Sequence, residues 1–346
     1  MNAYNKGILI IKIGAVGDSV MALSMLNEID KKYPGAEITW ICGKIIAPLI
    51  KSFERINRVI VIDDFELLRG SFLSRFKVLF RVWFLLALKK YDIVISAYKN
   101  RGYGLLALTT IKKEYRSFSS KSRKNQMIKG RYHASEYARL IHGIDDWQVP
   151  EPVLPEISLA SNRNIDAIVD KLKHPRFILV PAGAKNLING GLQRRWSIEY
   201  YYSLAKQLIT KYKDCSIILA GSKDDSWAFE NFRNLPIINL IGETTLINLI
   251  YLYNKCDILI THDTGLFHLA KLSNIKTIAL FGPVNPIEMA GNHRNISWIW
   301  KGAELPCSPC YDGKSFADCS NNICMKNISV EMVLEKITDI MNLIKI

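Results

Sequence analysis

The stretch Ile258-Leu-Ile-Thr-His-Asp-Thr-Gly-Leu-Phe-His-Leu-Ala270 joins an apolar run to a polar turn and an amphipathic segment. This order recurs along the chain, where short apolar runs alternate with longer amphipathic stretches. The alternation is typical of parallel strands joined by crossover helices. The sequence therefore predicts an α/β protein built on parallel sheets.

The predicted strands fall into two sets, separated by Val149-Pro-Glu-Pro-Val-Leu-Pro155. Three prolines in seven residues favour an extended connector, and a chain of 346 residues suits two domains better than one. The strands are expected at 8–13, 38–41, 59–62 and 93–96, then at 177–180, 216–220, 237–239, 258–261 and 277–281. We predict an N-terminal domain at 1–150, a linker at 151–175, a C-terminal domain at 176–328 and a final helix at 329–346.

The composition, 49% apolar and 23% charged residues, is that of a globular protein and excludes long disorder. The longest apolar run, Val82 to Leu88, is too short to cross a hydrocarbon layer of about 30 Å. Met1 to Gly7 leads directly into a predicted strand and lacks the features of a cleaved leader. We therefore expect a cytoplasmic protein.

The net charge of +14 is concentrated in the N-terminal half, where residues 1–150 hold 25 Lys and Arg against 13 Asp and Glu. Lys99 to Arg131 holds ten basic residues against the single acid Glu114. Such a segment attracts polyanions through its summed potential. Nucleic acid, an anionic membrane face and a phosphorylated glycolipid all remain possible partners, as does a merely solvated basic surface.

Phe72 to Lys90 interleaves aromatic residues with Arg and Lys and predicts a basic amphipathic helix. Helices of this kind can lie in a membrane interface. An apolar stripe at helical spacing more often packs in a core, and we expect core packing here.

The first predicted strand ends in Lys12-Ile-Gly-Ala-Val-Gly-Asp18, ahead of a predicted helix. Gly14 and Gly17 permit a tight turn and a close ligand, and the amides of a helix N-terminus attract anions. The spacing is not that of the dinucleotide-binding fingerprint. Asp18 is a candidate catalytic carboxylate, with a helix N-cap as its structural alternative.

The second half offers three further candidate binding turns. Thr264 and Gly265 follow a strand, at a position where free backbone amides and a hydroxyl would face a bound anion. Asp263 and His268 flank them, and each has either a binding role or a structural one. Gly183 and Ala184 follow another strand, and Arg194 and Arg195 supply fixed charge suited to a diphosphate, unless they are an ordinary surface pair. Asp224 and Asp225 suit ribose hydroxyls or an exposed turn.

Four of the seven cysteines lie within eighteen residues, at Cys307, Cys310, Cys319 and Cys324. In a cytosolic protein, four thiolates in one polar loop fit a tetrahedral metal site better than disulfides or free thiols. We therefore predict a structural zinc or iron site.

Several motifs stand together in one order: Gly17-Asp18, Arg194-Arg-Trp-Ser197, Leu240-Ile-Gly-Glu-Thr-Thr-Leu246, His262-Asp-Thr-Gly-Leu-Phe-His-Leu-Ala270 and Phe281-Gly-Pro-Val-Asn-Pro286. Over residues 7–340 the chain thereby resembles the heptosyltransferases of glycosyltransferase family 9. Arg194 stands where that family commonly has Lys, Ser197 replaces a frequent Pro, and Val284-Asn285 replaces Thr-Asp.

The resemblance implies a GT-B fold, two Rossmann-like domains with parallel sheets facing a cleft, and a final helix that packs back on the N-terminal domain. It implies an inverting transfer from ADP-L-glycero-D-manno-heptose to an anionic lipopolysaccharide inner-core acceptor at the cytoplasmic face of the inner membrane. No cofactor is implied for the chemistry.

The resemblance also implies residue roles. Asp18 would be the general base, and Arg194, Thr264 and Gly265 would stabilise the leaving diphosphate. The ribose would bind Asp224 or Asp225, the adenine would lie along Gly242, Thr244 and Leu246, and the sugar would contact Asp263. We expect the basic residues Lys99, Arg101 and Arg123 to contribute to acceptor binding.

Three alternatives compete with this interpretation. A non-catalytic nucleic-acid-binding protein would explain the basic half, although no signature of RNA or DNA binding accompanies it. A sugar-nucleotide-binding protein without activity would not need Asp18. A transferase acting on a protein or another glycan stays open.

Overall fold

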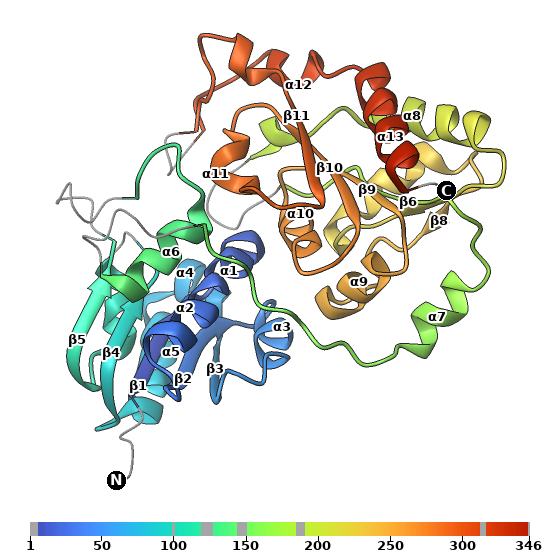
Figure 1. Ribbon diagram of the computed structural model, residues 1–346. Coiled ribbons are helices and arrows are strands. Elements are labelled where there is room, and N and C mark those ends of the chain that lie inside the picture. The colour runs from blue at the N-terminus through green and yellow to red at the C-terminus, as the bar shows by residue number, and fades with distance from the viewer. Residues whose placement is uncertain are drawn as a thin grey trace. The chain divides into compact units, whose positions relative to one another are not determined.

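The computed structural model describes residues 6–98, 101–118, 127–143, 151–184, 191–311 and 316–344. The chain divides into two compact units after Ser158, within the stretch predicted to be a linker. Each unit is built on one parallel sheet (Figure 1). The predicted α/β fold with two Rossmann-like domains is confirmed.

The first unit holds a five-stranded sheet in the order β3-β2-β1-β4-β5. Its strands are β1 (Gly7–Ile11), β2 (Glu37–Gly43), β3 (Arg58–Ile62), β4 (Lys90–Ser96) and β5 (Ile111–Ser117). Its helices are α1 (Val16–Ala22), α2 (Ser24–Lys32), α3 (Ala47–Lys51), α4 (Asp64–Arg69), α5 (Phe72–Leu86), η1 (Arg101–Ala107) and α6 (His133–His142). The central strand β1 pairs in parallel with β2 and β4.

The second unit holds a six-stranded sheet in the order β11-β10-β9-β6-β7-β8. Its strands are β6 (Arg176–Val180), β7 (Ser216–Leu219), β8 (Ile238–Asn239), β9 (Ile258–His262), β10 (Lys276–Phe281) and β11 (Ile296–Trp300). Its helices are α7 (Arg163–Val169), η3 (Leu192–Arg194), α8 (Ile198–Lys211), η4 (Lys223–Phe232), α9 (Leu246–Tyr253), α10 (Gly265–Ala270), α11 (Pro286–Ala290), η5 (Gly302–Glu304), α12 (Ile323–Lys326) and α13 (Val330–Ile344). The neighbours of β6 are β9 and β7, so the loops that follow these three strands emerge at one edge.

Two strands, β5 and β11, were not among those expected from the sequence. Both are edge strands. The first five residues of β5 are exposed, and apolar and polar residues do not alternate along its sequence. An edge strand with one neighbour needs no continuous apolar run, so its sequence signal is weak.

The final helix α13 contributes Val330, Val333, Ile337, Ile340 and Met341 to the core of the second unit, and packs on α8 and β10. The apolar face of α13 is buried in the second unit. The expectation that this helix also packs on the N-terminal domain stays a prediction.

Helix α5 also departs from expectation. Within it, Val82 and Leu86 are buried, whereas Phe72, Phe80 and Phe84 are exposed. The prediction that the aromatic stripe packs in the core is wrong for these residues. Among the helices in the described parts of the chain, none is long and apolar enough to cross a bilayer.

Candidate functional site

In the first unit, the candidate carboxylate Asp18 lies in the first turn of α1, two residues after the helix begins. The N-cap of α1 is Ala15, so Asp18 is not the capping residue. Its side chain is 44% exposed and forms an ion pair with Lys12, whose Nζ lies 3.3 Å from Asp18 Oδ2. The turn thus presents one solvent-accessible carboxylate beside a buried ammonium, and Gly17 beside it is buried.

Lys12 is only 1% exposed. Its Nζ lies over the ring of Tyr98, 4.3 Å from the centroid, and 5.2 Å from that of Tyr137. Burial by itself lowers the pKa of Lys12, but Asp18 and Tyr137 outweigh it and raise the pKa overall. Lys12 therefore stays charged and pairs with the Asp18 carboxylate.

Tyr98 fixes the backbone of the same turn. Its hydroxyl accepts hydrogen bonds from the amides of Ile13 and Gly14 at 2.9 and 3.1 Å and donates to the carbonyl of Gly14 at 2.9 Å. Burial raises the pKa of Tyr98, so the phenol stays protonated and can donate. Lys12, Tyr98 and Tyr137 are functional candidates that sequence reasoning missed, although the lysine inside an apolar strand was a visible signal.

In the second unit, the loops after β6, β7 and β9 meet as the sheet order requires. Asp225 Oδ1 accepts a hydrogen bond from the Gly183 amide at 2.9 Å, and Oδ2 accepts from the amide and hydroxyl of Ser222 at 2.9 and 2.6 Å. Asp225 is 5% exposed, and both of its oxygens serve this loop structure. Of the two candidate ribose ligands, only Asp224 is exposed.

Gly183 lies where a side chain would not fit. Its φ of +91° is strained for other residues, and an added Cβ would lie 3.3 Å from Cγ2 of Thr264. The adjacent Ala184 also has positive φ, at 60°. The loop after β6 thereby packs directly on Thr264, the N-cap of α10, whose hydroxyl accepts from the amide of Phe267. Gly265 is the first residue of that helix.

Arg194 connects these loops. Its Nη1 donates to Asp263 Oδ2 at 3.1 Å, and its Nη2 donates to the carbonyl of Ala184 at 2.9 Å. Next to it, Arg195 Nε donates to the carbonyl of Gly183 at 2.7 Å, and its guanidinium lies over the ring of Trp227. Burial lowers the pKa of Arg195, with Arg194 adding to the effect. The two arginines are therefore built into the site and are not an ordinary surface pair.

Asp263 is buried between two basic groups, Arg194 and His268, whose Nε2 lies 3.6 Å from Asp263 Oδ1. Burial by itself raises the pKa of Asp263, but Arg194 and then His268 hold it far below the usual range. The carboxylate is thus ionised and 4% exposed. This arrangement fits an anchor for Arg194 better than the sugar contact that the family resemblance implied.

The remaining predicted residues lie at the same edge or outside the described residues. The amide of Gly242 donates to the carbonyl of Gly221 at 3.0 Å, which holds the turn after β8 against the turn after β7. Thr244 and Leu246 follow at the start of α9 and are partly exposed. Lys99, Arg123 and the side chain of Arg101 lie outside the described residues.

The four clustered cysteines do not form a coordinating group. Cys307 and Cys319 are exposed, Cys310 is intermediate and Cys324 is buried. Burial raises the pKa of Cys324 to about 11, and the other three thiols add to the rise. Among the described residues, no group of three or more His, Cys, Asp or Glu is arranged to hold a metal ion.

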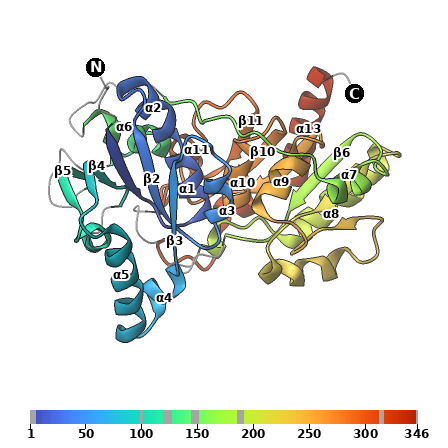
Figure 2. The same ribbon diagram turned by 90° about the horizontal axis from the view of Figure 1, so that it is seen from below.

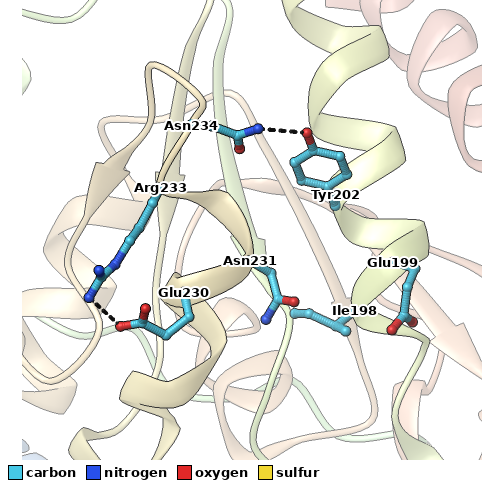
Figure 3. Close-up of a pocket in the computed structure, with 7 residues that line it drawn as sticks. All are labelled: Ile198, Glu199, Tyr202, Glu230, Asn231, Arg233 and Asn234. Atoms are coloured by element: carbon cyan, nitrogen blue, oxygen red, sulfur yellow. Dashed lines mark hydrogen bonds and ion pairs between the residues drawn. The ribbon is translucent and has the colours of Figure 1, made fainter.

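A separate hollow of about 410 Å³ lies between α8 and η4 (Figure 3). Arg233 pairs with Glu230 at its edge, and the amide of Asn234 donates to the hydroxyl of Tyr202. None of the predicted site residues lines it. The hollow is therefore distinct from the cluster at the strand ends.

The sequence model of glycosyltransferase family 9 (heptosyltransferase) matches residues 80–320. A lipooligosaccharide heptosyltransferase 2 of Campylobacter jejuni is 24% identical, over 93% of this chain and 94% of its own length. The structure of ADP-heptose lps heptosyltransferase II from E. coli is 20% identical, with a TM-score of 0.73 over 98% of this chain and 100% of that one. The iron-containing dodecameric glycosyltransferase TibC from enterotoxigenic E. coli is 11% identical, with a TM-score of 0.60 over 98% and 77%.

A buried histidine in this cluster gives a measurable pH dependence. Burial, and next the charges of Arg194 and Arg195, lower the pKa of His262 to about 3, against about 6.5 when unfolded. The unfolded chain therefore binds one more proton between these values, and the free energy of unfolding falls by about 1.4 kcal/mol per unit as the pH drops below 6.5.

We expect a His262→Gln variant to lose this dependence. Denaturant unfolding at pH 7, 6 and 5 should give a shallower decline for the variant than for the native chain. Identical slopes over that interval would show that His262 does not remain neutral in the folded protein.

Proposed function

The chain belongs to glycosyltransferase family 9, the heptosyltransferases, and from that membership we propose that it transfers heptose from ADP-L-glycero-D-manno-heptose to an inner-core lipopolysaccharide acceptor. It is a glycosyltransferase enzyme of the GT-B type. The lipooligosaccharide and ADP-heptose enzymes that it resembles support this substrate pair. The observation that carries the mechanism is the accessible carboxylate of Asp18 held beside buried Lys12.

We propose that Asp18 is the general base. Its carboxylate would accept the proton of an acceptor hydroxyl as that oxygen forms a bond to C1 of the heptose. The bond from C1 to the diphosphate oxygen breaks on the opposite side, so ADP leaves with the electron pair and the configuration at C1 inverts. Lys12 would position the carboxylate through their ion pair.

The leaving diphosphate would be stabilised by fixed groups of the second unit. Arg194, held by Asp263 and the Ala184 carbonyl, presents a cation of low mobility. The amides at Thr264 and Gly265 would add hydrogen bonds at the start of α10. Asp224 would bind the ribose, and the turn from Gly242 to Leu246 would flank the adenine.

The acceptor is expected to be anionic and membrane-borne. An excess of basic residues in the N-terminal half, 25 against 13 acidic ones, supports an acceptor that carries phosphate. We accordingly propose a cytoplasmic protein that is peripheral at the inner membrane, with no nucleic acid partner.

Replacing Asp18 tests the mechanism. Asp18→Asn should lower kcat at least about a hundredfold, the usual scale for a positioned base, while leaving binding of ADP, measured by calorimetry, nearly unchanged. Asp30→Asn, which removes a different ion pair of the same unit, is the control and should keep its activity. An Asp18→Asn enzyme with more than half of the native rate would remove Asp18 from the mechanism.

Replacing Arg194 tests stabilisation of the leaving group. Arg194→Ala should weaken ADP binding at least about tenfold, since charge-assisted hydrogen bonds contribute about 1.5–3 kcal/mol, whereas Arg194→Lys should retain most of it. Transfer should also continue in excess chelator. The assignment would be contradicted if chelation abolished transfer and Mg²⁺ restored it. It would also be contradicted if Arg194→Ala and Arg194→Lys bound ADP equally well.

We further propose that Cys307, Cys310, Cys319 and Cys324 bind one structural zinc or iron ion. Thiolates suit both metals. Burial, and next the neighbouring thiols, raise the pKa of Cys310 and Cys324, and a bound cation would favour their thiolate forms. The iron in the related TibC supports this proposal. Binding would require the loop to draw its ligands together, because the described residues do not hold them in a coordinating arrangement.

Elemental analysis of protein purified without metal-affinity resin tests the site. We expect about one equivalent of metal per chain, the number that four thiolates hold in a tetrahedral shell. Replacing any one of the four with Ser should lower metal content and Tm together. Cys215→Ser, outside the cluster and partly buried, should change neither. Metal-free protein with four titratable thiols in this loop would refute the proposal.

A further inference from the structure

Helix α5 has two apolar faces, of which the fold buries only one. Successive residues are about 100° apart around a helix axis, which places Val82 and Leu86 on one side and Phe72, Phe76 and Phe80 on another. The first side lies in the core of the first unit. On the second side, Phe72, Phe80 and Phe84 are 82%, 59% and 77% exposed.

The exposed aromatic side chains are held in place. The rings of Phe76 and Phe80 stack at 6.2 Å, and Trp83 meets Phe76 edge-on at 6.3 Å. The indole of Trp83 donates to the carbonyl of Leu105 at 2.6 Å. The middle of the stripe is therefore a set of packed rings that is joined to η1 through Trp83.

The exposed apolar surface continues from α5 onto η1, which packs against it, and onto the residue that follows η1. Leu105 and Leu108 are 48% and 57% exposed. Figure 2 shows α4 and α5 extending beyond the strands of the first sheet. The α5 face is defined by Phe72, Leu73, Phe76, Phe80, Phe84, Leu105 and Leu108.

The segment that carries the α5 face is rich in basic residues. Residues 63–113 contain ten Lys and Arg against four acids, Asp63, Asp64, Glu66 and Asp92. Asp92 is itself buried and paired with Lys113. Lys77 and Arg81 are exposed and follow the aromatic stripe around the helix. On their other side they line a hollow that also holds Asp63 and Glu66.

We propose that the α5 face is a membrane-docking surface that lies in the interface of a bilayer with anionic headgroups. Aromatic rings favour the interfacial region, and flanking Lys and Arg bind lipid phosphates. A second copy of the chain fits less well, because two such basic rims would repel each other. This surface would bring the enzyme to its acceptor, and in that respect the proposal rests on the proposed function.

Vesicle flotation of the full chain tests the surface without any need for catalysis. The native protein should float with vesicles of phosphatidylethanolamine and phosphatidylglycerol, and at least tenfold less with phosphatidylcholine alone. Phe80→Gln/Phe84→Gln should reduce flotation at least tenfold, whereas Leu343→Gln, which changes an 81% exposed residue of α13, should not. Lys77→Gln/Arg81→Gln should reduce it more than Lys171→Gln/Lys213→Gln, a control pair of exposed lysines with the same charge change.

Activity separates the docking surface from the chemistry. The Phe80/Phe84 variant should keep its rate on a delipidated core oligosaccharide and lose it on acceptor in vesicles. Absence of heptose transfer by the native protein would refute the proposed function and leave the flotation result standing. Equal flotation of native and Phe80/Phe84 proteins would overturn the docking surface, as would sedimentation showing that these residues hold a dimer that does not bind vesicles.

Discussion

Each unit buries a charged side chain just past the end of a central strand, and a buried charge must be paired. Lys12 follows β1 and is paired with Asp18, and Asp263 follows β9 and is paired with Arg194. Removing one partner of such a pair typically costs about 3–5 kcal/mol, because the other charge stays desolvated. The pairing requirement therefore fixes where Asp18 and Arg194 point, and it fixes them before any substrate binds.

The two pairs differ in which partner faces solvent. In the first unit the cation is buried and the carboxylate is 44% exposed, which leaves a proton acceptor accessible. In the second unit the carboxylate is buried, and Arg194 retains 12% exposure. In the proposed reaction the first pair would supply the base and the second the cation for the leaving diphosphate. Within its own unit, each of these groups is already held by its ion pair.

The sequence predicted most of the sheet edge, because turn chemistry after a buried strand is local. Gly183, Arg194, Asp263 and Thr264 were identified in this way, and the structure brings them into contact. The sequence could not show that Asp225 accepts a hydrogen bond from the Gly183 amide, because Gly183 lies 42 residues away along the chain. The cage of Tyr98 and Tyr137 around Lys12 was missed for the same reason.

Helix α5 shows a different limit of sequence reasoning. A periodic apolar pattern states that a helix has an apolar face, but it does not state what covers that face. Here the pattern is wide enough for two faces, and the sheet needs only the one that holds Val82 and Leu86. Large apolar patches exposed to water promote association, so such a patch on a protein surface indicates a binding partner that covers it. Over residues 63–113, ten Lys and Arg stand against four Asp and Glu, and this positive excess favours an anionic occupant. The aromatic and basic residues of α5 that predicted core packing are thus explained by the chemistry of an exposed surface.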